Sequence, residues 1–507
     1  MALARAWAIA LIGLDGHLVE VEADLALGLP GLSVIGLPDA ALAESRDRVR
    51  AAVVNSGQSW PQRRVTLALS PATLPKRGSS FDLALAAAVL AANEAVPADA
   101  LLGRVLLGEL GLDGRVRAVP GVLPAVLTAL RHGVERVVVP VDNLAEARLV
   151  PGAQVTGVAS LSSLIELLRG EGCGDEPTEL EAAPSPVSLL DLVDVGGQPV
   201  GRAAVEVAAA GGHHLFLLGP PGAGKTMLAE RLPGILPPLS LDEALEVTAI
   251  HSIAGRLSEQ PLVSCAPFQD PHHTASVSSI VGGGSGVARP GAASLAHRGV
   301  LFLDEAPEFA SGVLDGLRQP LEKGSVAIAR AGGVATYPAR FSLVLAANPC
   351  PCAGETTCVC PPNSRRRYLG RLSGPLLDRV DLQITVPRVT RAELLADQGG
   401  SESSGIVAAR VADARRLAAA RFRGTPWRLN GDVPPVELHR RWPVNRAATG
   451  SAEAALDNGT LTARGYGRVL RVAWTLADLQ GVGPPTKDQV DQALGYRTGP
   501  AAKAVAA

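Results

Sequence analysis

A glycine-rich stretch in the middle of the chain has the composition of a phosphate-binding loop. Gly219-Pro-Pro-Gly-Ala-Gly-Lys-Thr226 directly follows the apolar run Leu215-Phe-Leu-Leu218. It matches the pattern GxxxxGK[ST] in the strand–loop–helix setting that this pattern requires. Backbone N–H groups of such a loop surround phosphates, so we expect Lys225 to reach the β- and γ-phosphates of ATP and Thr226 to bind Mg²⁺. The other cofactor-binding positions predicted here are Gly219, Pro220, Pro221, Gly222, Ala223, Gly224 and Met227.

Two more apolar runs end in polar residues that suit the same chemistry. Val300-Leu-Phe-Leu303 leads into Asp304 and Glu305; Asp304 can hold Mg²⁺ through water, and Glu305 can polarise the attacking water. Leu343-Val-Leu-Ala-Ala347 leads into Asn348, whose amide can orient that water or sense the γ-phosphate. A strand-ending Asn-Pro turn is the alternative for this position. Together with the phosphate loop, these residues predict ATP hydrolysis.

Composition narrows the class of protein. The 507 residues are 47% hydrophobic and 19% charged, which is typical of a packed globular protein with two or three domains. The formal net charge of −2 gives no overall attraction to nucleic acid, so any DNA contacts must come from local basic loops. No apolar run reaches the roughly 18 residues of a membrane helix. The six cysteines do not resemble a disulfide framework, and we expect a cytoplasmic protein with no membrane partner.

The chain divides into segments of different composition. Residues 1–170 alternate strand and helix signals, with period-two alternation over Leu18–Leu25, and predict an α+β domain. Residues 171–189 are acidic and proline-rich, as expected of a linker. The remaining segments are an α/β block over 190–390, an Ala-, Arg- and Leu-rich helical segment over 391–497, and a tail over 498–507 that is expected to be flexible.

The three nucleotide-site elements, together with Ser373-Gly-Pro-Leu-Leu-Asp-Arg379-Val-Asp381, resemble AAA+ ATPases of the magnesium-chelatase and MCM-helicase branch. The resemblance implies a P-loop AAA+ core and an α-helical C-terminal lid. It also implies that Arg379 is an arginine finger, which stabilises the transferring phosphoryl group of ATP bound by a neighbouring subunit. The alternative is that Arg379 forms a surface salt bridge with Asp378 or Asp381.

Two further positions follow from the same resemblance. The segment from Thr462 to Asp478 is similar to the C-terminal helix that carries the second sensor arginine, and the matching residue is Arg464. The segment from Asp194 to Gln198 is similar to the one that borders the adenine. The resemblance therefore implies that Arg464 is catalytic and that Gln198 belongs to the cofactor-binding residues.

A more specific resemblance covers nearly the whole chain. Gly28–Pro38, Glu44–Arg50, Pro271–Ser276 and the stretch from the glycine run at 282–284 to Pro290-Gly291 are similar to the ComM/YifB family of magnesium-chelatase-like ATPases. ComM members are regarded as hexameric DNA helicases that drive branch migration during uptake and recombination of transforming DNA. The resemblance implies a homo-hexameric ring, with single-stranded or branched DNA as a partner.

Two glycine-rich insertions agree with a DNA motor. Ser276–Ala292 lies where this branch has an insert in its second helix, and Gly324–Arg340 predicts the two strands of a hairpin before the sensor strand. In a ring such hairpins point into the pore and grip phosphates, although ordinary glycine-rich surface hairpins are the alternative. His272 and His273 are expected to anchor the first insertion rather than to bind metal, because no further ligand is evident. The candidate DNA contacts are Arg289, Lys323, Arg330 and Arg340.

The N-terminal segment resembles the protease domain of Lon, a ribosomal S5 domain 2-like fold. The stretch Pro75-Lys-Arg-Gly-Ser-Ser80 places Ser80 at the position of the Lon nucleophile. The lysine that should accept its proton matches Leu123. Because a serine hydroxyl without a base is a poor nucleophile, we expect the fold without the protease chemistry.

Four cysteines crowd the segment that follows Asn348. Cys350-Pro-Cys352 and Cys358-Val-Cys360 could bind Zn²⁺ as four thiolates, or they could form a reduced cysteine-rich loop. A zinc ion would brace this loop and would not be catalytic, because four thiolates leave no open coordination position.

These observations predict a ring-forming ATPase that translocates on DNA or drives its branch migration. The alternative is a chelatase-type motor that remodels a protein partner for metal insertion into a tetrapyrrole. A scaffold that binds ATP without turnover is disfavoured, because both Asp304 and Glu305 are present.

Overall fold

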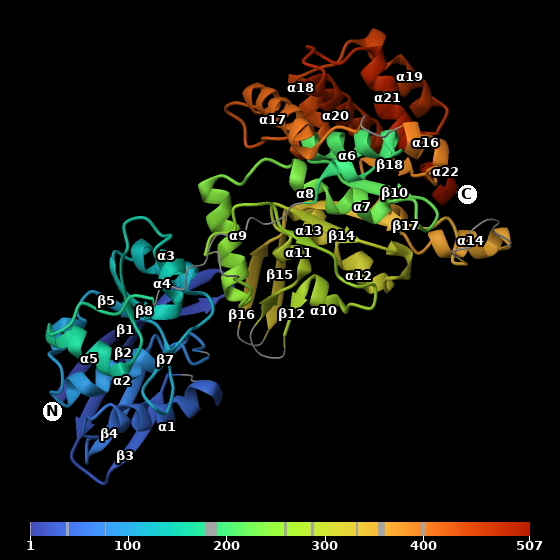
Figure 1. The fold of residues 1–507 in the computed structure, drawn as a ribbon. Coiled ribbons are helices and arrows are strands. Elements are labelled where there is room, and N and C mark those ends of the chain that lie inside the picture. Colours follow the sequence, from blue (N-terminus) through green and yellow to red (C-terminus); the bar gives the residue numbers. More distant parts are fainter. Residues whose placement is uncertain are drawn as a thin grey trace.

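The computed structural model describes residues 2–36, 40–76, 78–177, 190–257, 261–284, 288–330, 333–352, 360–396 and 401–506. They form an N-terminal part, a central part built on a parallel sheet, and a helical C-terminal part (Figure 1). No helix in these ranges is long and apolar enough to cross a membrane. Of the expected linker, residues 171–177 are described, and they pack on the N-terminal part, where the Asp175 N–H donates to the Gly157 carbonyl at 2.8 Å.

The N-terminal part is built on a seven-stranded sheet in the order β3-β4-β2-β1-β5-β8-β9. β1 and β2 form a long antiparallel ribbon, β2 also pairs antiparallel with β4, and the other neighbours are parallel. Burial alternates along β2, as predicted for Leu18–Leu25, because one face of the sheet covers the core. The strands are β1 (Ala2–Ile12), β2 (Asp15–Ala26), β3 (Gly31–Ile35), β4 (Arg64–Ser70), β5 (Arg104–Leu106), β8 (Arg136–Pro140) and β9 (Gln154–Val158), with a separate hairpin of β6 (Glu109–Leu110) and β7 (Val116–Arg117).

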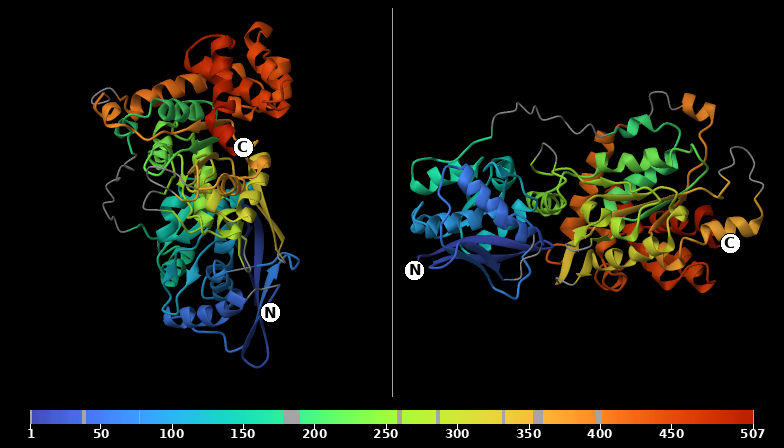
Figure 2. Two further views of the ribbon diagram at one scale, coloured as in Figure 1. Left: turned by 90° about the vertical axis from the view of Figure 1, so that its right-hand side faces the viewer. Right: turned by 90° about the horizontal axis from the view of Figure 1, so that it is seen from below.

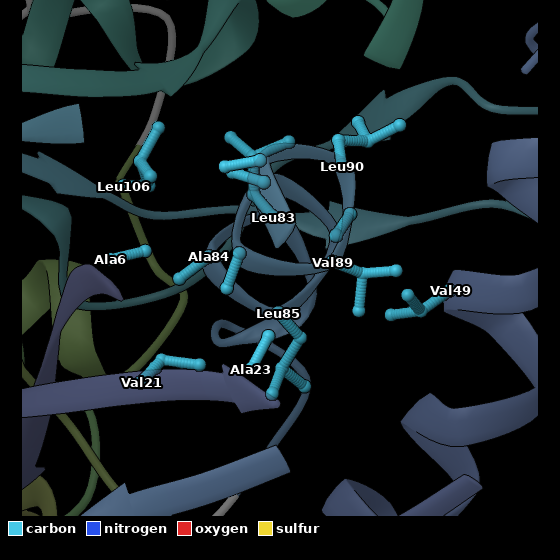
Figure 3. Close-up of a cluster of buried hydrophobic side chains, with 14 of the residues drawn as sticks. Ala6, Val21, Ala23, Val49, Leu83, Ala84, Leu85, Val89, Leu90 and Leu106 are labelled. Carbon is cyan, nitrogen blue, oxygen red and sulfur yellow. The ribbon is translucent and has the colours of Figure 1, made fainter. Parts of the chain in front are cut away.

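Small aliphatic side chains fill the core between this sheet and its helices. Every residue of α2 (Asp82–Ala92) is buried, as expected of a helix that is apolar on all sides. It packs against Val21 of β2 and Val49 of α1 (Figure 3). The one charged residue of α2, Asp82, accepts a hydrogen bond from Arg48 Nε at 2.8 Å. The other helices are α1 (Ala40–Asn55), α3 (Val122–Arg131), α4 (Leu144–Ala147) and α5 (Leu161–Arg169).

The central part contains five parallel strands in the order β11-β14-β17-β10-β18. All residues of β10 and β14 are buried, which is typical of parallel strands covered on both faces. Successive side chains of β10 face two different cores, Leu217 on one side and Phe216 on the other. The strands are β10 (Leu215–Leu218), β11 (Phe268–Gln269), β14 (Val300–Leu303), β17 (Ser342–Ala347) and β18 (Leu382–Thr385). The helices are α6 (Pro199–Gly211), α7 (Lys225–Glu230), α8 (Leu232–Ile235), α9 (Leu241–Ile253), α10 (Val277–Ile280), α11 (Ala292–Leu295), α12 (Ser311–Gly316), α13 (Arg318–Lys323), α14 (Pro362–Leu369) and α15 (Gly374–Leu377).

Two antiparallel hairpins leave the central sheet. β12 (Gly282–Gly283) pairs with β13 (Arg289–Pro290), and β15 (Ser325–Arg330) pairs with β16 (Gly333–Pro338). The second pair consists of the two strands predicted over 324–340. The β1–β2 ribbon of the N-terminal part reaches this hairpin (Figure 2), and Ile12 packs against the core cluster that contains Ala335 of β16.

The C-terminal part is helical, as predicted, and it corrects one expectation. The described residues of the segment expected to be a flexible tail are helical instead, because α22 (Pro500–Ala506) lies against β18 with Ala501 fully buried. Proline suits the first turn of a helix and alanine its interior, and the burial of Ala501 holds this short helix on the sheet. The remaining helices are α16 (Arg391–Ala396), α17 (Ser404–Arg421), α18 (Pro435–Arg441), α19 (Arg446–Asp457), α20 (Ala463–Leu479) and α21 (Lys487–Thr498).

A buried polar contact joins the N-terminal part to α9. The Gly121 N–H donates to Ser252 Oγ at 3.0 Å, and the Ser252 hydroxyl donates to Glu146. Glu146 also accepts from the Leu123 N–H at 2.8 Å, and burial raises the pKa of its carboxyl in spite of these hydrogen bonds. Leu123 is fully buried. Leu123, which the Lon resemblance aligns with the protease lysine, is therefore packed where the N-terminal part meets α9.

Candidate active site

The carboxyl ends of three neighbouring strands meet at one edge of the central sheet. β10 leads into the phosphate loop, β14 into Asp304, and β17 into Asn348. Because the strands are parallel and lie in the order β14-β17-β10, the three predicted elements come together. Lys225 Nζ donates to Asn348 Oδ1 at 3.0 Å, and Thr226 Oγ1 donates to Asp304 Oδ2 at 2.8 Å.

Lys225 is a buried amine held on its own loop. Its Nζ also donates to the carbonyls of Gly219 at 2.7 Å and Pro220 at 3.0 Å. Burial lowers the pKa of Lys225, and the carboxylates of Asp304 and Glu305 oppose this shift. A buried ammonium needs an acceptor for each N–H, and phosphate oxygens are acceptors that can replace these carbonyls.

The backbone of the loop depends on glycine at defined positions. Gly222 and Gly224 adopt left-handed conformations, with φ of 71° and 84°, which glycine accepts without strain. A Cβ at Gly219 would lie 2.2 Å from the carbonyl oxygen of Val386. The start of the loop therefore passes too close to the end of β18 for any side chain.

Gln198 holds the phosphate loop in place through hydrogen bonds to the backbone. Its amide donates to the carbonyl of Ala223 at 2.9 Å and to that of Pro387 at 2.7 Å. The side chain, predicted to belong to the adenine border, is buried and fixes the loop backbone. Met227, one position after Thr226, is 38% exposed on α7.

Thr226 and Asp304 offer the donor set of a magnesium site. A hydroxyl and a carboxylate are hard oxygen ligands of the kind that Mg²⁺ prefers, and the 2.8 Å contact between them shows that both can reach one ion. The other carboxylate oxygen of Asp304 accepts from the Glu305 N–H at 2.8 Å. These residues would hold Mg²⁺ in the ATP complex.

Glu305 has an unusual backbone and an unpredicted partner. Its φ of 50° lies in the left-handed region, which is uncommon for a residue other than glycine and concentrates at functional sites. His273 Nδ1 lies 3.5 Å from Glu305 Oε2, and the His272 and His273 rings lie against each other at an angle of 33°, with centroids 4.1 Å apart. The expectation from the sequence that the two histidines anchor a loop missed this contact. The sequence signal for the contact was the position of the histidines a few residues after β11, the strand beside β14.

Arg379 forms an ion pair with Glu322 at the end of α13. Asp381, one of the two partners considered in the salt-bridge alternative, pairs with Arg468 of α20 at 2.6 Å instead, and Asp378 pairs with another arginine. Burial would raise the pKa of Asp381, but Arg468 and the neighbouring histidines hold it well below its usual value. Asp381 thereby fixes the arginine segment to the C-terminal helices.

Arg379 and Arg464 line one cavity of about 1090 Å³, called the arginine cavity below. Burial, followed by the charges of Arg318, Arg464 and Arg468, lowers the pKa of Arg379. In the described part of the chain, the lining of this cavity includes neither the phosphate loop nor Asp304, Glu305 or Asn348. The two predicted catalytic arginines therefore lie together, in a cavity whose described lining does not include the phosphate loop of the same chain.

The four candidate DNA contacts fall into two groups. Arg289 and Arg330 are exposed on the two adjacent hairpins, and Arg330 Nε donates to the Gly284 carbonyl at 3.0 Å. Lys323 and Arg340 line the arginine cavity instead. The structure thus brings together only the first pair as a candidate surface for nucleic acid.

Three of the four clustered cysteines lie in the described ranges. The sulfur atoms of Cys350, Cys352 and Cys360 are all within 4.8 Å of one another. Cys358 lies outside the described residues. Among the described residues, these cysteines form the one group of three or more His, Cys, Asp or Glu ligands that could share an ion.

Comparisons with known proteins match the whole length of this architecture. Family models match residues 21–143 (subunit ChlI of Mg-chelatase), 191–394 (magnesium chelatase, subunit ChlI) and 401–497 (magnesium chelatase, subunit ChlI C-terminal). An uncharacterized protein of Mycobacterium tuberculosis is 57% identical over 98% of this chain and 99% of its own length. The uncharacterized protein YifB of Escherichia coli is 40% identical, over 98% and 97%. The competence protein ComM of Haemophilus influenzae is 39% identical, over 98% of both chains.

The chain belongs to the ComM/YifB family of magnesium-chelatase-like AAA+ ATPases. Membership confirms the family predicted from the sequence and, in broad terms, its architecture of α/β sheets followed by a helical C-terminal part. The ComM/YifB family uses Mg-ATP, and the oxygen donors of Thr226 and Asp304 fit that ion.

Proposed function

We propose that this ComM/YifB protein is a cytoplasmic motor, a homo-hexameric ring that couples Mg-ATP hydrolysis to translocation on DNA or to its branch migration. The observation that carries the proposal is the arginine cavity, which holds Arg379 and Arg464 but no described residue of the phosphate loop. An arginine finger must reach the γ-phosphate, so these guanidiniums serve the ATP of a neighbouring subunit. Head-to-tail contacts of this kind close into rings.

Within each proposed site, the residues divide the work of phosphoryl transfer. Lys225 would neutralise the charge of the β- and γ-phosphates, and Thr226 and Asp304 would hold a Mg²⁺ ion that supplies further positive charge there. Glu305 accepts a proton from the attacking water, which Asn348 orients. The hydrogen bond between Lys225 and Asn348 fixes the lysine and the amide relative to each other.

The two hairpins support DNA as the partner. Arg289 stands opposite Gly283 in the β12–β13 register, and a Cβ at Gly283 would lie 3.4 Å from Arg330 Nη2. Two exposed guanidiniums beside bare glycine backbone offer donors that grip phosphates without reading bases. Because the net charge of the whole chain is −2, the protein as a whole does not attract DNA, and DNA must bind at a local basic site such as this one.

The ATPase rate of the full-length protein with and without DNA tests this proposal. Single-stranded and forked DNA are expected to raise the rate severalfold. Arg289→Ala with Arg330→Ala should remove this stimulation and leave the basal rate unchanged. Arg446→Ala is the matched control, because its side chain is 93% exposed on α19, in the C-terminal part. A rate that responds to neither DNA would contradict the proposal and favour a protein partner.

His273 is expected to restrain turnover in the absence of DNA. The imidazole lies 3.5 Å from the carboxylate that is proposed to polarise water, and the histidine belongs to the segment that precedes α10 and the β12–β13 hairpin. His273→Ala should therefore raise the basal ATPase rate severalfold and reduce the further stimulation by DNA. His273→Asn, which keeps a donor, should behave more like the natural protein. A lower basal rate in His273→Ala would show instead that the imidazole supports Glu305 during catalysis.

A further inference from the structure

The loop between β17 and α14 gathers sulfur atoms from two places in the sequence. Cys350 and Cys352 follow directly after Asn348-Pro349, and Cys360 precedes α14. Cys350 Sγ and Cys352 Sγ are 3.0 Å apart, and Cys360 Sγ lies within 4.8 Å of both. Four sulfurs at about 2.3 Å from a tetrahedral zinc ion are separated by about 3.8 Å. The three sulfurs therefore occupy a space that one metal ion can fill.

The types of ligand indicate which ion. Thiolates in tetrahedral arrangement select zinc or iron, whereas magnesium and calcium require oxygen. The sequence has another cysteine at 358, which lies outside the described residues. Cys350 is only 4% exposed, and a buried thiolate gains most from direct coordination to a cation.

We propose that Cys350, Cys352 and Cys360 bind one structural Zn²⁺ ion beside Asn348. Thiolates are the usual ligands of structural zinc sites. The ion would tie Cys350, two positions after Asn348, to Cys360, two positions before α14. The metal site itself does not depend on the proposed function of the protein.

The contacts around the proposed metal site show that the ion would position Asn348. The backbone of Asn348 hydrogen-bonds the phenol of Tyr368, a buried residue of α14. The guanidinium of Arg365 donates to the Cys360 carbonyl at 3.3 Å. Both ends of the loop are thus tied to α14, and Asn348 in turn accepts from Lys225. Zinc would act as a positioning element for Asn348; this second step rests on the proposed ATPase mechanism.

Metal analysis of the full-length protein tests the site. Protein purified under reducing conditions from zinc-supplemented medium is expected to contain about one zinc per chain, released by an organomercurial that titrates thiolates. Cys350→Ser with Cys352→Ser should reduce the zinc content at least tenfold. Cys173→Ser with Cys265→Ser is the matched control and should keep full zinc, because Cys173 and Cys265 lie outside the cluster.

A further variant keeps the test decisive if the serine protein is unstable. Cys352→His replaces one zinc ligand by another and is expected to retain zinc. A cysteine-rich loop that does not bind metal would not contain zinc in this variant. Natural protein without zinc, iron in place of zinc, or full zinc in the Cys350→Ser/Cys352→Ser protein would each overturn the proposal. Loss of zinc that lowers kcat for ATP with an unchanged Kd for ATP would support the positioning of Asn348. An unchanged kcat would reject that positioning and leave the metal site standing.

Discussion

Glu305→Gln is expected to stop ATP turnover and to leave ATP binding intact. The amide has nearly the shape of the carboxylate, so the left-handed backbone at 305 and the 2.8 Å hydrogen bond from its N–H to Asp304 remain. It cannot accept a proton from water, and the loss of a general base typically lowers kcat by about 10²–10⁴-fold. Phosphate release measures kcat, and titration with a fluorescent ATP analogue measures Kd, which should change little.

Glu308→Gln is the matched control for this prediction. Glu308 lies in the same segment, and its carboxylate pairs with Arg371 at 3.0 Å rather than facing the phosphate loop. Its kcat should stay within about twofold of the natural protein, since an exposed ion pair contributes only about 0–1 kcal/mol. Residual turnover in Glu305→Gln above a tenth of the natural rate would mean that another group activates the water.

The sequence predicted the positions of those site residues that directly follow a strand, because a local pattern determines these positions. A strand, a glycine turn and a helix are contiguous, so Lys225 and Thr226 could be assigned roles from eight residues. Asp304 and Asn348 follow strands that read as unbroken apolar runs, and parallel strands place their carboxyl ends at one edge of a sheet. The β15–β16 hairpin was predicted for the same reason, because a hairpin is set by its own turn.

Contacts between distant segments could not be predicted from such patterns. The pairing of His273 with Glu305 depends on β11 lying beside β14, an adjacency that no local motif specifies. The salt-bridge alternative for Arg379 named only its sequence neighbours Asp378 and Asp381, but the packing of α13 brings Glu322 to it. Helix α22 was missed because a short alanine-rich segment is marginal by propensity and gains its stability only by burying Ala501 against the central part.

Arg379→Ala is expected to reduce the ATPase rate by about 10³-fold or more, the usual contribution of an arginine finger. Burial and three neighbouring arginines lower the pKa of Arg379, and a crowded, partly desolvated guanidinium gains most from an approaching phosphate. Arg416→Ala is the matched control. Arg416 lines the same cavity, but it is 75% exposed and pairs with Asp413 at 2.9 Å, so its loss should change the rate less than about twofold.

Mixing two inactive variants shows whether Arg379 acts on the ATP of a neighbouring subunit or on the ATP of its own chain. Lys225→Ala removes the phosphate contact but keeps Arg379, and Arg379→Ala keeps the phosphate loop, so each variant alone should be inactive. In a randomly mixed ring with equal amounts, about a quarter of the head-to-tail interfaces combine an intact loop with an intact finger. ATPase activity should therefore return on mixing, toward about a quarter of the natural rate. If every mixture stays inactive while the two proteins demonstrably assemble together, the arginine acts on the ATP of its own chain, because only then does no interface regain both groups.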